Sequence, residues 1–358
     1  MLEIKNKGIL RIKNLLGSPY SLKENIGWFK RYVCGPNMNN HGNVQYISKS
    51  SILNKINPKY TISFIGDIMD LNLRNLRIGE SVKRFVKGSD FLIGNFEATL
   101  TSDKKLINGK RHKPQIMRAL ENLFNPRKTF LSTANNHSGD YGEKCFQDSV
   151  KYLEKRGFNI FGTKKIPFLD LTHNLRVIGS TQWSNCHCNY LTKLEDATRY
   201  LKEDSFNLLF PHWGYEMELY PRIETIGQGL KLLKKFDAIV GHHSHCPQPV
   251  SYIPIGIHNK LIAYSLGDFC DGKEFEMHKY GIVIKIEIGT DVNGEWQVGK
   301  CTWNFLKTHS LSETEFIVEI VENFSNFLFK YESLGREYKT DDLFSENYLD
   351  MIPLEVCV

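Results

Sequence analysis

The feature that most constrains the fold is a series of short apolar runs, each followed by polar residues. The runs are rich in β-branched and aromatic residues and are bounded by turn residues, as buried strands are. Between several of them lie segments with helical periodicity, and this alternation predicts a largely parallel or mixed sheet with helices on its faces. The runs span residues 60–67, 90–95, 129–135, 206–212, 237–242 and 261–268, and the helical segments span 113–123, 144–156 and 226–236.

The pattern changes after Tyr280. Residues 282–288 and 296–303 alternate between apolar and polar positions around an Asn293-Gly294 turn, which predicts an antiparallel hairpin. A final helix is predicted over residues 313–331, where it would close the core.

Length and composition describe an ordinary globular chain of 358 residues with a net charge of +6. The main domain is predicted over residues 58–345, with an N-terminal extension at 1–57 and a tail at 346–358. The charge does not indicate nucleic-acid binding and is compatible with an anionic substrate. Neither a signal peptide nor a run of about 18 apolar residues is found, so we expect a cytoplasmic protein without a transmembrane segment. Apolar residues within 9–16 predict an amphipathic helix that packs on the core.

The polar residues at the ends of the apolar runs are those that bind metals. In open α/β sheets ligands bind outside the carboxyl ends of the strands, so these side chains are expected to converge. Carboxylates, a carboxamide oxygen and imidazoles suit Mn²⁺, Fe²⁺ or Zn²⁺. One or two ions are expected, and a pair about 3.5–4 Å apart could support displacement at phosphorus. The residues are Asp67, Asn95, Glu97, Asn136, His137, His212, His242, His243 and His245.

Other catalytic patterns are not found in the sequence. It contains neither the G-x-S-x-G elbow of serine hydrolases nor a G-x-x-x-x-G-K-[ST] phosphate loop. Within the histidine-rich segment, His243 and His245 are expected to point to the same side, because alternate residues of an extended segment do so. His242 is then expected to point the opposite way and to serve a structural role.

A series of short segments between about residues 60 and 270 resembles, in order, the motifs of the CapA/PgsA capsule-synthesis family. That family is associated with poly-γ-glutamate capsule production and is related to calcineurin-like metallophosphoesterases. The segments are Gly66-Asp67-Ile68-Met69, Asn95-Phe96-Glu97, Ala134-Asn135-Asn136-His137, Asp140-Tyr141-Gly142, His212-Trp213-Gly214-Tyr215-Glu216, Gly241-His242-His243-Ser244-His245 and Tyr264-Ser265-Leu266-Gly267-Asp268-Phe269.

The resemblance implies an α/β fold of the αββα type, in which mixed sheets are flanked by helices. It also implies a metal-dependent hydrolase that acts on a phosphoester or on an anionic cell-envelope polymer or its precursor. The implied metal ligands include Asp67 as the first carboxylate and Glu97 as the bridging or second carboxylate, with Asn95 beside it. Asn136 is implied as the carboxamide ligand. His212 and His243 are implied to bind one ion, and His245 the other. The implied catalytic group is His137 as the acid or phosphate-contacting imidazole, with Asp140 and Glu216 as orienting residues.

One departure from the phosphoesterase pattern supports a second hypothesis. The pattern has a histidine two residues after the first aspartate, and this chain has Met69 there. Under this hypothesis the chain is a non-catalytic component of a poly-γ-glutamate or capsule assembly complex. The site would then bind an anionic polymer or partner proteins.

Overall fold

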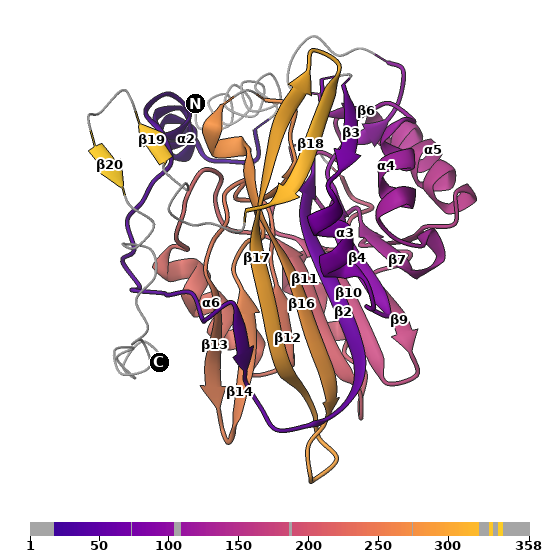
Figure 1. The fold of residues 1–358 in the computed structure, drawn as a ribbon, viewed down its shortest axis with the longest axis vertical. Coiled ribbons are helices and arrows are strands. Elements are labelled where there is room, and N and C mark those ends of the chain that lie inside the picture. The colour runs from indigo at the N-terminus through magenta and orange to yellow at the C-terminus, as the bar shows by residue number, and fades with distance from the viewer. Residues whose placement is uncertain are drawn as a thin grey trace, which may run out of the picture.

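Two mixed β-sheets pack face to face, with helices on both outer sides, in a computed structural model of the chain (Figure 1). The structure describes residues 18–72, 74–103, 109–185, 188–273 and 275–321, and the backbone of 329–331 and 336–338. The two mixed sheets flanked by helices confirm the predicted fold class.

The larger sheet has ten strands and contains the parallel set β2, β4, β7 and β8. Strand β16 pairs antiparallel with β2 and with β17, which confirms the predicted hairpin. In spatial order the sheet contains β3 (Asn75–Ile78), β18 (Glu315–Ile320), β17 (Trp296–Ser312), β16 (Tyr280–Thr290), β2 (Asn57–Ile68), β4 (Phe91–Phe96), β7 (Thr129–Ser132) and β8 (Asn159–Phe161), with β1 (Ser50–Ile52) on β17 and β15 (Asp268–Cys270) on β2.

The smaller sheet has six strands, of which β14, β12, β11 and β10 run parallel and the two edge strands antiparallel. Two short pairs lie outside the sheets. In spatial order the sheet contains β13 (Val250–Ile255), β14 (His258–Ala263), β12 (Ala238–Val240), β11 (Phe206–His212), β10 (Leu175–Thr181) and β9 (Phe168–Thr172); the short pairs are β5 (Thr99–Leu100) with β6 (Arg111–His112) and β19 (Phe329–Tyr331) with β20 (Arg336–Tyr338).

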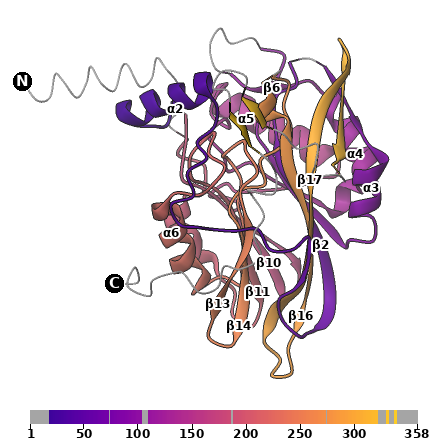
Figure 2. The ribbon, with the colours of Figure 1, turned by 60° about the vertical axis from the view of Figure 1, so that its left-hand side comes forward.

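Helices cover the outer face of each sheet (Figure 2). Three pack on the larger sheet, α6 packs on the smaller one, and α2 lies across the upper end of the strands. The helices are α2 (Leu22–Cys34), α3 (Glu80–Val86), α4 (Ile116–Leu123), α5 (Gly142–Lys155) and α6 (Ile223–Leu233), with short 3₁₀ turns at η1 (Pro126–Lys128), η2 (Leu194–Tyr200) and η3 (Glu276–His278).

The central strands contain apolar runs where both of their faces are buried. On β2, Phe64 packs between the sheets, whereas its neighbour Ile65 packs under the helices of the larger sheet. On β11, Leu208 likewise faces the inter-sheet core, and Leu209 faces the layer that contains α6. Alternate residues of a strand point to opposite faces, so a strand covered on both sides needs a continuous apolar run.

The C-terminal helix predicted over residues 313–331 is wrong. The segment forms strand β18, which pairs antiparallel with β17, and its residues 322–328 lie outside the described part of the chain. The sequence Glu315-Phe316-Ile317-Val318-Glu319-Ile320 is rich in β-branched residues, and Phe316, Ile317 and Val318 are buried. β-Branched side chains fit a half-buried pleated surface better than a helix, and here tertiary packing decided between the two patterns.

Other predictions concern parts that the structure does not describe. The amphipathic segment at residues 9–16 and the tail at 346–358 lie outside the described residues, and the domain limits at 57 and 345 stay predictions. Among the described helices, none is long and apolar enough to cross a bilayer.

Candidate metal centre

The ends of strands from both sheets bring the predicted site residues together at one edge of the sandwich. Asp67 lies near the end of β2, and Asn95 lies near the end of β4. Asn136 and His137 follow β7, and His212 is the last residue of β11. All five are buried. The convergence follows from topology, because the parallel strands of each sheet point their carboxyl ends to the same edge.

A close approach of the backbone fixes the position of Asp67. Its N–H donates to the carbonyl oxygen of Gly267 over 2.9 Å, where the loop before β15 crosses β2. A side chain at Gly66 would place its Cβ 2.0 Å from that same oxygen. Only glycine therefore permits the contact that holds the aspartate.

Two carboxylates form the first half of the centre. The side-chain amide nitrogen of Asn95 donates to Asp67 Oδ1 over 2.7 Å and to Glu97 Oε2 over 2.9 Å. The amide oxygen of Asn95 accepts from Asn135 Nδ2 over 3.1 Å. The nitrogen of Asn95 thus holds the two carboxylates and its oxygen is bound by Asn135, and its predicted role as a metal ligand stays a prediction.

Imidazoles from the smaller sheet complete the centre. His212 Nδ1 lies 2.8 Å from His242 Nδ1, and His212 Nε2 lies 2.8 Å from Asn136 Oδ1. His242 Nδ1 is also 3.3 Å from Asp67 Oδ1, and His212 Nε2 is 3.6 Å from Glu97 Oε1. Ligand atoms of Asp67, His212 and His242 lie within 4.8 Å of one another, which is compact enough to surround one ion.

His243 and His245 contact the carboxylates from the other side. The backbone N–H of His243 donates to Asp67 Oδ2 over 3.0 Å, and its ring forms a second compact group with Glu97 and His212. His245 Nδ1 lies 2.8 Å from Asp268 Oδ1, while its Nε2 faces Glu97 Oε1 at 3.8 Å. A carboxylate that holds one ring nitrogen and leaves the other directed at the centre is the usual arrangement for a metal-binding histidine.

The expectation that His242 points away from the site is wrong. It assumed an extended backbone, whereas His243 has a φ of 106° and His245 a φ of 54°. These left-handed conformations change the direction of the chain at His243 and at His245, so that all three rings turn toward the carboxylates. Such backbone angles cost roughly 1–3 kcal/mol each for residues other than glycine, and they concentrate at functional sites.

Three atoms of the centre have unmet hydrogen-bonding capacity. Glu97 Oε1, His242 Nε2 and His243 Nδ1 are fully buried and have no hydrogen-bond partner among the described residues. A buried polar atom without a partner costs about 1–3 kcal/mol, and the cost is higher for a charged group. The donor set of carboxylate oxygens and imidazole nitrogens suits Mn²⁺, Fe²⁺ or Zn²⁺. The residues therefore fit one or two divalent ions.

Burial and neighbouring charges shift the pKa values of the groups in the centre. Burial alone would raise the pKa of Asp67, but the contact with His242 and the charge of His245 hold it well below its usual range. Burial and the neighbouring Asp67 raise the pKa of Glu97 well above its usual range. Burial lowers the pKa of His243 to about 3, so its ring is neutral and able to bind a metal.

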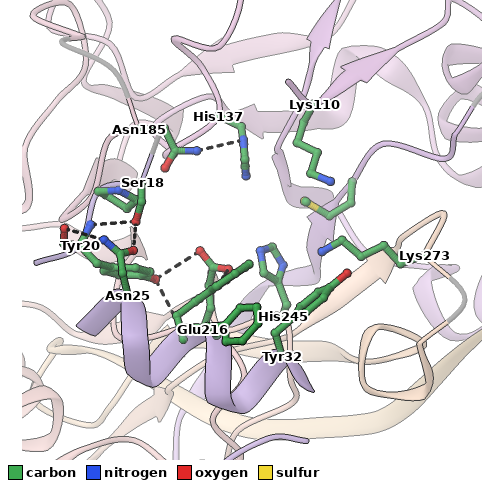
Figure 3. Close-up of a pocket in the computed structure, with 14 residues that line it drawn as sticks. Ser18, Tyr20, Asn25, Tyr32, Lys110, His137, Asn185, Glu216, His245 and Lys273 are labelled. Carbon is green, nitrogen blue, oxygen red and sulfur yellow. Dashed lines mark hydrogen bonds between the residues drawn. The ribbon is translucent and has the colours of Figure 1, made fainter. Parts of the chain in front are cut away.

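Beside the centre, His137 lies at the edge of a cavity (Figure 3). Its Nδ1 is 2.7 Å from Asp140 Oδ2 and 3.2 Å from Asn185 Nδ2, so both partners act on the same ring nitrogen. Nε2 is then the nitrogen left for a ligand. Glu216 lies on the other side of the cavity and accepts a hydrogen bond from Trp28 Nε1 over 2.7 Å.

The sequence prediction did not include the contribution of the N-terminal segment. Tyr20 is only 2% exposed, and its hydroxyl lies 2.7 Å from His243 Nε2. On α2, Arg31 Nε donates to the carbonyl oxygen of Glu216 over 2.8 Å and thereby fixes the helix beside the site. No motif marks these residues, because their partners lie far away in the sequence.

The carboxylates and histidines thus define a buried candidate metal centre at the strand ends. The family model for "Bacterial capsule synthesis protein PGA_cap" matches residues 59–168 and 170–273, which contain every predicted site residue. Because the match covers more than half of the chain, this protein belongs to that family.

Two relatives carry capsule-related names. The PGA biosynthesis protein CapA of Bacillus subtilis strain 168 is 24% identical over 311 residues, which cover 75% of this chain and 80% of that protein. The capsule biosynthesis protein CapA of Bacillus anthracis is 29% identical over 252 residues, which cover 60% of each chain.

Solved structures with a related arrangement are more distant. A hypothetical protein from Thermus thermophilus is 13% identical, with a TM-score of 0.43 over 69% of this chain and 99% of that one. The calcineurin-like phosphoesterase YfkN from Bacillus subtilis is also 13% identical, with a TM-score of 0.37 over 69% of this chain and 91% of that one.

Proposed function

We propose that this protein is a metal-dependent hydrolase that cleaves a phosphoester in a capsule or cell-envelope polymer or its precursor. The main support for the proposal is a buried group of metal-binding side chains, some with atoms that lack a hydrogen-bond partner, next to a cavity. Glu97, His242 and His243 of the centre each have a buried polar atom without a hydrogen-bond partner among the described residues. Membership of the capsule-synthesis family and the names of its relatives support the biological setting.

The residues that would hold the ions are the two carboxylates and the surrounding imidazoles. When bound, divalent ions would supply positive charge and Lewis acidity to a phosphoryl group at the edge of the cavity. Asn95 holds the two carboxylates at a fixed separation, and Asp268 orients one imidazole. The ligands would be Asp67, Glu97, Asn136, His212, His242, His243 and His245.

His137 would serve as the proton donor. Asp140 fixes the orientation of its ring through Nδ1, which leaves Nε2 to deliver a proton to the leaving ester oxygen. Water would attack phosphorus as the ester P–O bond breaks. One water proton would return to the imidazole through solvent, and the other would stay on the product phosphate.

The test is hydrolysis of glycerol 2-phosphate, an ester whose alkoxide leaving group needs a proton, by the full chain loaded with Mn²⁺, Fe²⁺ or Zn²⁺, measured as phosphate released. A positioned general acid contributes about 10²- to 10⁴-fold, so His137→Gln should lower kcat within that range while the metal content is unchanged. Asp140→Asn should lower kcat by at least about tenfold through loss of the ring orientation. His309→Gln is the matched control, because His309 is half-exposed and lies outside the site. Metal-loaded protein that hydrolyses neither this ester nor a diester contradicts the proposal.

A second candidate function rests on Met69. Its side chain is buried and lines the cavity at the position where the phosphoesterase pattern has a histidine. A centre without that imidazole favours a binding component of a capsule assembly complex, which takes up an anionic polymer. This alternative expects polyglutamate binding that a chelator does not change, with no hydrolysis by the metal-loaded chain. The hydrolase proposal expects the reverse.

A further inference from the structure

A cavity of about 450 Å³ opens above the candidate centre. One wall is aromatic and comes from α2, which contributes Trp28, Phe29 and Tyr32. The ammonium groups of Lys110 and Lys273 face the same cavity, and Lys273 lies beside Tyr32 (Figure 3). The two lysines come from segments far apart in the sequence, and the fold brings both to the same side of one cavity.

Lys110 is positioned through its backbone N–H, which leaves its ammonium group available to a ligand. Its N–H donates to Asp140 Oδ2 over 2.9 Å, on the same carboxylate oxygen that holds His137. Its ammonium points into the cavity near His137 (Figure 3). No carboxylate within the described ranges forms an ion pair with it, so a cation without a counter-charge faces the space above the centre.

Lys273 lies just after β15, and its stem is also fixed. Its N–H donates to Asp271 Oδ1 over 2.8 Å, while its Nζ lies 3.3 Å from His278 Nε2 and 3.8 Å from Asp271 Oδ2. These contacts place the ammonium without closing a tight ion pair. Burial would lower the pKa of Lys273, but Asp271 and Asp268 raise it, so the lysine is charged at neutral pH.

The described lining of the cavity carries the two ammonium groups and the carboxylate of Glu216, so its cations outnumber its anions. A phosphoryl group at the metal centre would be contacted by the ions and by His137. Two ammonium groups on one wall then remain for another oxyanion, for which lysine is a usual point-charge partner. The aromatic side chains of α2 offer an apolar surface for a ring or an alkyl chain.

We propose that Lys110 and Lys273 form a subsite for a second oxyanion next to the scissile phosphoester. The preferred substrate then carries a phosphate or a carboxylate adjacent to the reacting phosphate, with an apolar or ring portion against α2. This inference rests on the proposed function, because it places the first phosphate at the metal centre. It makes the two lysines determinants of specificity and leaves the chemistry to the residues below.

The test is calorimetric titration of the metal-loaded full chain with three probes. Phosphate has no second oxyanion, phosphoglycolate adds a carboxylate, and pyrophosphate adds a phosphate. At least one of the two larger probes should bind about tenfold more tightly than phosphate, and the stronger one identifies the second group. The metal content is measured after each titration, so that loss of ions to the probe is recognised.

Variants then assign the difference to the two lysines. Lys110→Gln and Lys273→Gln should each remove most of the preference, whereas Lys110→Arg and Lys273→Arg should retain it because the charge is kept. Lys113→Gln is the matched control, since Lys113 is exposed and outside this cavity. Equal affinity for all three probes, or a preference unchanged in both glutamine variants, overturns the subsite.

The outcome separates this inference from the proposed function. Lysine-dependent binding of a larger probe without hydrolysis of any ester would retain the subsite and remove the hydrolase. Hydrolysis of glycerol 2-phosphate with no lysine-dependent preference would retain the hydrolase and remove the subsite.

Discussion

The hydroxyl of Tyr20 allows a direct test of whether the N-terminal segment supports the metal centre. It is buried and lies 2.7 Å from His243 Nε2, while Nδ1 of the same ring has no partner among the described residues. If Nδ1 binds the ion, Nε2 carries the proton and donates it to the Tyr20 oxygen. Tyr20→Phe removes this acceptor and keeps the ring, which packs against Trp183 at a centroid distance of 5.1 Å.

The expected magnitude follows from that single hydrogen bond. Loss of the outer partner of a metal-binding histidine typically costs about 10- to 100-fold in metal affinity. At about 1.4 kcal/mol per tenfold, this corresponds to about 1.4–2.8 kcal/mol. The range agrees with the cost of about 1–3 kcal/mol for a buried N–H left without a partner.

The assay is competition for Mn²⁺ or Zn²⁺ between the protein and a chromogenic chelator. Tyr20→Phe should raise the Kd by about 10- to 100-fold, and Tyr32→Phe should leave it unchanged. Tyr32 lines the same cavity, and no hydrogen bond from its hydroxyl to the centre occurs in the described part of the chain. An unchanged Kd in Tyr20→Phe, with the fold intact by circular dichroism, would refute the reasoning.

Three further predictions concern stability. Gly241→Ala would place a Cβ 2.2 Å from Trp213 Nε1, so it should lower the free energy of unfolding in urea by about 1–3 kcal/mol, whereas Gly227→Ala has open space in α6 and should raise it by up to about 1 kcal/mol. Burial alone would raise the pKa of Glu24, but its hydrogen bonds to Arg222 and Arg31 outweigh burial and lower the pKa, so the stabilisation they give is complete above the unfolded-state pKa and is lost as pH falls through the folded-state value. Glu24→Gln should therefore make the free energy of unfolding fall less on acidification. An unchanged dependence on pH would contradict this. Metal at about 100 times its Kd should raise the free energy of unfolding by about 2.7 kcal/mol in urea titrations, and no shift would mean that the folded state does not bind it.

Much of the fold could be predicted because buried strands leave a clear pattern. The run at residues 206–212 matches β11 at both ends, and residues 60–67 lie within β2. The C-terminal segment was mistaken because Glu315–Ile320 contains spaced acidic residues that also fit a helix. Its antiparallel pairing with β17, the strand that directly precedes it in the sequence, decided the outcome.

The site could be predicted only as far as strand ends converge. The structure brings Asp67, Glu97 and His212 close together as expected, because each lies at or just after the end of a strand that reaches the same edge. Whether they bind a metal stays a prediction.

Local backbone geometry explains why one residue was misjudged, and long-range packing explains why two others were not predicted. His242 was misjudged because positive φ angles at His243 and His245 break the alternation of an extended segment. Tyr20 and Lys273 carry no motif, and only the packing of α2 and the loop after β15 places them at the cavity.

The central claim is that the strand-end residues hold divalent metal, and the most direct test is metal content per chain by mass spectrometry. Wild type is compared with Asp67→Ala, His243→Ala and the control His309→Ala, all as the full chain. The account predicts near-stoichiometric Mn, Fe or Zn in wild type and in the control, and loss of that metal in both site variants. Wild type without metal even after loading, or site variants that retain it, would contradict the account.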